Sequence, residues 1–119
     1  MAANPVTPIS DLSLETVKSP EEVIVRCSGK IISSTSAQLQ TLVRSLIPET
    51  PCVVIDLTDV SYLDSSGLGA IVGLYVSAKR QNCRLKLINL SQRLQQLFRL
   101  TKLASIFEGH EEFLGHTPD

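Results

Sequence analysis

Aromatic side chains are scarce in this chain, which has no tryptophan, two tyrosines and three phenylalanines in 119 residues. A hydrophobic core must therefore be built mainly from leucine, isoleucine and valine, within an apolar fraction that is ordinary for a globular protein. The length predicts a single domain. The formal net charge of -1 argues against a protein that neutralises phosphates, so we expect no direct nucleic-acid partner.

Long apolar runs are also missing, and none reaches the length needed to span a bilayer. Residues 1–10 lack the basic start and apolar centre of a signal peptide. The three cysteines, Cys27, Cys52 and Cys83, are odd in number, have no metal-ligand spacing and lie in or beside apolar runs. We interpret them as reduced core residues, and we predict a cytoplasmic protein with no membrane span and no metal site.

Apolar periodicity and turn residues predict the order of the elements. Expected strands are 12–16, 23–28, 52–57 and 84–89, expected helices are 37–47, 66–80 and one capped by Ser91, and a short strand and a helical turn follow at 105–107 and 111–114. The first two strands should pair antiparallel across a short turn, whereas strands alternating with helices should be parallel. We therefore expect an α/β domain at 11–115 with a mixed sheet of four to five strands, between a flexible leader at 1–10 and a loose tail at 116–119.

The segment 62–69 reads Tyr-Leu-Asp-Ser-Ser-Gly-Leu-Gly and joins the apolar strand at 52–57 to the following helical pattern. A helix N-terminus leaves backbone N–H groups unpaired and carries a partial positive charge, which stabilises a phosphate as well as a capping oxygen. Ser65 is expected just outside the helix, where a phosphoryl group would not require the helix to melt. Ser66 is the expected cap.

The other polar and small residues of this segment allow two interpretations. Asp64 would repel a phosphate on Ser65, so its expected role is to cap the helix or to face a basic group on a partner. Gly67 and Gly69 would let a partner approach closely. The alternative is that Asp64 and Ser66 are only capping residues and that the glycines only allow tight helix packing.

Motifs of catalysis and nucleotide binding do not fit the spacing. A dinucleotide-binding fingerprint has the spacing Gly-x-Gly-x-x-Gly, but after Gly67 and Gly69 the third glycine, Gly73, comes one residue too late. No acidic residue follows at the expected distance. No Gly-Lys-Ser/Thr of a phosphate-binding loop is present. A nucleophile elbow requires a glycine where Leu63 stands. The only histidines, His110 and His116, lie near the C-terminus, so we predict neither an enzyme nor a cofactor.

Residues 53–57 and 60–69 resemble the signature of STAS domains, in particular that of bacterial anti-sigma factor antagonists. The resemblance continues through 85–89 and 92–98 and covers roughly 12–114. It implies helices packed mainly on one face of the sheet. It also implies partner switching, in which the antagonist binds an anti-sigma factor that is a serine kinase and so frees a sigma factor. The kinase inactivates the antagonist by serine phosphorylation, and a serine phosphatase reverses it.

In this family the phosphoacceptor directly follows the aspartate, which assigns the role to Ser65, with Ser66 as the runner-up. The residues expected to bind the partner are Ser33, Ser34, Thr35, Asp64, Ser65, Ser66, Gly67, Leu68 and Gly69. One loop departs from the family pattern. Family members often have Gly-Glu-x-Asp after the second strand, whereas this chain has Gly-Lys-Ile-Ile at 29–32, which leaves the identity of the partner open.

A second interpretation is a STAS interaction or scaffold module that does not switch, as in a stress-sensing complex or in transporter regulation. It predicts stable complexes that ignore phosphorylation. A third interpretation, a small-ligand or nucleotide binder, depends only on the glycines. For either STAS interpretation we expect a monomer or a weak dimer.

Overall fold

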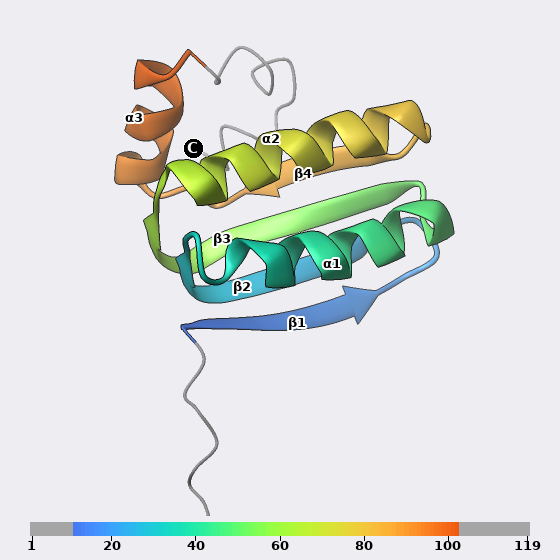
Figure 1. The fold of residues 1–119 in the computed structure, drawn as a ribbon. Coiled ribbons are helices and arrows are strands. Elements are labelled where there is room, and N and C mark those ends of the chain that lie inside the picture. The colour runs from blue at the N-terminus through green and yellow to red at the C-terminus, as the bar shows by residue number, and fades with distance from the viewer. Residues whose placement is uncertain (1–10, 103–119) are drawn as a thin grey trace, which may run out of the picture.

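The computed structural model describes residues 11–102, which form one sheet with helices (Figure 1). The expected leader at 1–10, the short strand at 105–107, the helical turn at 111–114 and the tail at 116–119 lie outside the described residues.

The described sheet has four strands in the order β1-β2-β3-β4. They are β1 Leu12–Lys18, β2 Val23–Ile31, β3 Cys52–Leu63 and β4 Arg84–Ile88. β1 pairs antiparallel with β2, whereas β2 with β3 and β3 with β4 are parallel pairs. The prediction of a mixed sheet that begins with an antiparallel pair is therefore confirmed.

The described helices are α1 Ser36–Leu46, the short 3-10 helix η2 Ile47–Glu49, α2 Ser65–Arg80 and α3 Gln92–Leu100. α1 and η2 connect β2 to β3, α2 connects β3 to β4, and α3 follows β4. Figure 1 shows α1 and α2 together on one face of the sheet, which confirms the expected packing. We call the opposite face of the sheet the outer face. At the start of α3, Ser91 accepts a hydrogen bond from the Leu94 N–H at 3.2 Å and is the predicted cap.

The core lies between the sheet and these helices and consists mainly of aliphatic side chains, as the composition predicts. Its fully buried members include Ile55 from β3, Leu39 from α1, and Ile71 and Leu74 from α2. One aromatic residue, Phe98 of α3, is also fully buried. The three cysteines are buried and form no disulfide, which agrees with their interpretation as small core residues.

Two strands are longer than the sequence pattern predicts. β2 does not end at Gly29, which has a φ of +116° and lets the strand continue to Ile31. A Cβ at Gly29 would lie 2.1 Å from the Asp11 carbonyl oxygen, so only glycine fits where the backbone of Asp11 approaches β2. β3 continues for six residues beyond Leu57, to Leu63.

The extension of β3 depends on two bulges. The register with β2 shifts between Arg26 and Ser28 and again between Gly29 and Lys30, and each shift adds one residue to β3. From Leu57 onward the buried positions of β3 are therefore Leu57, Val60 and Leu63, and the two residues inside each interval are exposed. Bulges bend a strand and redirect its side chains. In β3 they place successive polar side chains in solvent.

Candidate functional site

The candidate site is the junction of β3 and α2, where Asp64 connects two segments. Asp64 has an extended backbone, and its Oδ1 accepts the Gly67 N–H at 2.9 Å. Its Oδ2 accepts the Ser33 N–H at 3.3 Å, so the carboxylate also holds the loop after β2. The predicted capping role of Asp64 is confirmed. Ser66 is not the cap, because it is the second residue of a helix that already begins at Ser65.

The loop after β2 is held from inside by Thr35. Its hydroxyl donates to the Lys30 carbonyl at 2.7 Å and accepts the Ile32 N–H at 2.9 Å. Thr35 is only 5% exposed and occupies the N-cap position of α1, but its side chain makes no capping hydrogen bond to that helix. Its hydrogen bonds close the loop, and the loop presents Ser33 and Ser34 to solvent.

The two glycines of the motif lie in opposite environments. A Cβ at Gly67 would lie 2.1 Å from the Ile31 carbonyl oxygen, because the first turn of α2 packs directly on the end of β2. A Cβ at Gly69 would meet nothing within 4 Å. Tight packing therefore explains Gly67, whereas Gly69 leaves open space on the exposed side of α2. Leu68 between them points into the core and is 6% exposed.

Ser65 and Ser66 are both exposed at the start of α2. Neither hydroxyl makes a hydrogen bond to any residue in the range 11–102. The helix has 16 residues and no acidic side chain in its first turn. Its N-terminal amides and dipole favour an added anion, while the neighbouring Asp64 carboxylate opposes it. The junction thus combines free hydroxyls with one fixed negative charge.

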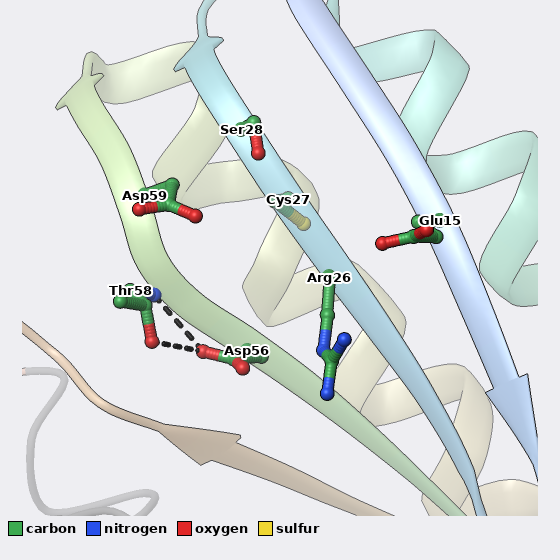
Figure 2. A pocket seen from close by; sticks show the side chains of 7 residues that line it. All are labelled: Glu15, Arg26, Cys27, Ser28, Asp56, Thr58 and Asp59. Atoms are coloured by element: carbon green, nitrogen blue, oxygen red, sulfur yellow. Dashed lines mark hydrogen bonds between the residues drawn. The ribbon is translucent and has the colours of Figure 1, made fainter.

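A second polar region lies on the outer face of the sheet, where a hollow of about 340 Å³ opens across β1, β2 and β3 (Figure 2). It is lined by Glu15, Arg26, Cys27, Ser28, Asp56, Thr58 and Asp59. Oδ1 of Asp56 accepts three hydrogen bonds, from the Thr58 hydroxyl at 2.6 Å, the Thr58 N–H at 3.0 Å and the Asn89 amide at 3.1 Å. The Thr58 hydroxyl is therefore already engaged.

Two ionisable groups of this hollow have shifted pKa values. Burial of Asp56 alone would raise its pKa, but the hydrogen bonds from Thr58 and Asn89 and the charge of Arg26 outweigh burial and lower the pKa. Burial, followed by the charge of Asp56, raises the pKa of the Cys27 thiol to about 12. Asp56 thus stays ionised and Cys27 stays protonated.

Two absences complete the description. No group of three or more histidine, cysteine, aspartate or glutamate side chains within residues 11–102 could hold a metal ion. In the same part of the chain, no helix has both the length and the apolar character needed to cross a membrane.

Sequence reasoning missed Tyr62 as a surface residue of this region. It belongs to β3 and is 49% exposed, although it is one of the few aromatic residues in the chain. The available signal was the three-residue spacing of Leu57, Val60 and Leu63, which indicates bulges and places Tyr62 outward.

The family model described as the STAS domain matches residues 13–114. The chain therefore belongs to the STAS domain family. Among curated proteins, it is similar to the anti-sigma-B factor antagonist of Bacillus subtilis, with 34% identity over 98 residues, covering 82% of this chain and 90% of that protein.

Two solved structures of the anti-sigma factor antagonist SpoIIAA have the same fold. The unphosphorylated form matches with a TM-score of 0.67 and 20% identity over 90% of this chain and 99% of that one. The phosphorylated form, described as a Bacillus cell fate determinant, matches with a TM-score of 0.64 and 22% identity, over 79% and 86% of the two chains. The family and fold predicted from the sequence are confirmed.

Proposed function

We propose that this STAS domain is an anti-sigma factor antagonist. In this proposal it binds an anti-sigma factor that is a serine kinase, frees a sigma factor, and is switched off when the kinase phosphorylates Ser65. The similarity to the anti-sigma-B factor antagonist of Bacillus subtilis supports the first part. A fold relative known in both an unphosphorylated and a phosphorylated form supports the second.

The observation that carries the proposal is the free, exposed hydroxyl of Ser65 at the first position of α2, beside a carboxylate whose position is fixed. A kinase needs an accessible hydroxyl, and no neighbour in the described chain competes for this one. Phosphorylation adds about 1.5 to 2 negative charges at neutral pH. Because Asp64 is held in place by Gly67 and Ser33, it cannot turn away without loss of the cap.

The proposed switch follows from electrostatics. A docked partner must desolvate the start of α2, and a phosphate next to Asp64 concentrates negative charge there. Repulsion and desolvation then oppose docking, so phosphorylation releases the kinase. A serine phosphatase would restore the docking surface. ATP belongs to the kinase in this scheme and needs no site on this chain.

The residues predicted to bind the partner divide into two groups. The first group is exposed and available for contact, and it consists of Ser33, Ser34, Ser65, Ser66 and Gly69. Thr35, Gly67 and Leu68 are buried, and Asp64 is partly buried with a hydrogen bond on each carboxylate oxygen, so these four residues shape the surface. Ser66 is the alternative acceptor, because this residue is also exposed.

Substitutions at Ser65 test this proposal. We expect Ser65→Asp to lose binding to the anti-sigma factor kinase in isothermal titration calorimetry, whereas Ser65→Ala binds like the wild type and accepts no phosphate. Ser19→Asp adds the same charge to an exposed turn at the opposite end of the sheet and should leave binding unchanged. A kinase complex that survives both phosphorylation and Ser65→Asp would instead support a scaffold module that does not switch.

A further inference from the structure

Tyr62 and Lys30 are exposed partners across β2 and β3. The second bulge of β3 turns both Ser61 and Tyr62 toward solvent, and the register pairs Tyr62 with Lys30. The next pair, Ile31 with Leu63, is buried in the core. Because side chains alternate along a strand, Tyr62 and Lys30 lie on the outer face, at the end of the sheet where α2 begins.

The backbone beneath both side chains is firmly held. The Lys30 N–H donates to the Asp11 carbonyl at 2.8 Å, and the Lys30 carbonyl accepts the Thr35 hydroxyl at 2.7 Å. On the other strand, the Ser61 hydroxyl donates to the Gly29 carbonyl at 3.3 Å. Thr35 also shapes the loop whose Ser33 N–H reaches Asp64. The Tyr62–Lys30 pair and the start of α2 therefore share one rigid frame.

Both side chains are available for contact. Tyr62 is 49% exposed, one of four large apolar residues in the described chain with such exposure. Lys30 is exposed, and its ammonium group forms no ion pair with any residue from 11 to 102. A half-exposed tyrosine offers a large, stiff and partly apolar contact, which is the type of residue that often dominates binding energy at interfaces. An unpaired lysine beside it selects for negative charge.

We propose that Tyr62 and Lys30 extend the docking surface around the end of the sheet and determine which anti-sigma factor binds. This inference rests on the proposed function. The partner presents an apolar patch to the Tyr62 ring and a carboxylate to the Lys30 ammonium group. An anti-sigma factor with a cationic group at that point is rejected by like-charge repulsion. Lys30 lies at the end of β2, within the segment 29–32 in which this chain lacks the family's acidic pattern. A positive charge stands there where family members often have carboxylates.

The test uses the full chain and the kinase that phosphorylates it, with binding rates measured by surface plasmon resonance at low and high salt. We expect Tyr62→Thr, which keeps a β-branched strand residue, and Lys30→Glu each to weaken binding by about tenfold or more. Lys30→Glu should also slow association. In the wild type, added salt should lower the association rate, and in Lys30→Glu this decrease should be absent. Lys30→Gln should show an intermediate effect.

Matched controls are Val17→Thr and Lys18→Glu at the far end of β1, which repeat the chemistry of the test variants on exposed residues away from the site. Thermal unfolding of each variant confirms that it is folded. Wild-type affinity and salt dependence in both Tyr62→Thr and Lys30→Glu would overturn the inference while leaving the proposed function intact. A wild-type chain that binds no anti-sigma factor kinase would overturn the proposed function and, with it, this inference.

Discussion

Asp56 of β3 and Asp64 directly after β3 both accept backbone N–H groups, yet they produce different surfaces. Oδ1 of Asp56 accepts three hydrogen bonds. One of them comes from the hydroxyl of Thr58, two residues further along β3. Asp64 uses its two oxygens for two backbone N–H groups, one on each side of the junction. The hydroxyls next to Asp64, on Ser65 and Ser66, remain without a partner in the described chain.

The comparison shows that context, and not residue type, distinguishes a candidate modification site from a structural cluster. Thr58 and Ser65 are both exposed hydroxyl residues near an aspartate. The Thr58 hydroxyl is held by Asp56 at 2.6 Å within a strand, so a kinase would have to break that bond. Ser65 begins a helix, where the residue is exposed and its backbone N–H belongs to the positive end of the helix dipole.

The largest expected effect separates the two glycines of the junction. Gly67→Ala would place a Cβ 2.1 Å from the Ile31 carbonyl oxygen, and backbone atoms cannot yield as a flexible side chain would. We expect a loss of about 2–3 kcal/mol in the free energy of unfolding, measured with urea. Gly69→Ala is the control, because its Cβ meets nothing within 4 Å and should stabilise the helix by about 0.5–1 kcal/mol. Equal effects would contradict the described packing.

A smaller effect is expected at the cap. Asp64→Ala removes the oxygen that accepts the Gly67 N–H and releases the loop at Ser33. We expect a loss of about 1–2 kcal/mol in unfolding free energy and faster hydrogen exchange at the Ser33 and Gly67 amides. Asp59→Ala, an exposed carboxylate of β3 without such bonds in the described chain, should change stability by less than about 0.5 kcal/mol. Unchanged exchange at both amides would contradict the bridging role of Asp64.

The smallest effect is expected at Asp56 and depends on pH. Its lowered pKa means that the ionised form stabilises the fold above the ordinary carboxyl pKa of about 4, and that this contribution is lost as the pH falls through the lowered value. Asp56→Asn weakens the bonds from Thr58 and Asn89 and should cost about 1 kcal/mol at pH 7. The difference from the wild type should shrink below pH 4, as followed by urea unfolding across pH. A constant difference would show that charge is not responsible.

The same comparison shows what the sequence could predict. Helix α2 follows from helical periodicity, the first half of β3 follows from its nearly continuous apolar run, and the Asp64–Gly69 segment has a specific signature. The second half of β3 did not follow, because two bulges break the alternation and polar residues flank the single buried Val60 between Thr58 and Tyr62, as in a loop. Gly29 also has the pattern of a strand end, although its positive φ lets β2 continue.

Within the site, spacing alone could not assign the roles of neighbouring residues. Asp64 and Ser66 are both good capping residues, and the choice depends on which one has extended backbone at the end of β3. Thr35 is the N-cap residue of α1, but its hydroxyl bonds the Lys30 carbonyl and the Ile32 N–H instead of the helix, and spacing does not distinguish these two uses. Gly67 and Gly69 look equivalent in sequence and differ only because α2 packs on Ile31.

Phosphate mapping tests the central claim most directly. The wild-type chain would be incubated with its anti-sigma factor kinase and Mg–ATP, and the modified residue identified by tandem mass spectrometry, with Ser65→Ala and Thr58→Ala treated in parallel. We predict a single phosphate on Ser65, absent from Ser65→Ala and unchanged in Thr58→Ala. Stoichiometric phosphorylation of Thr58, or no phosphate on either Ser65 or Ser66, would contradict the account.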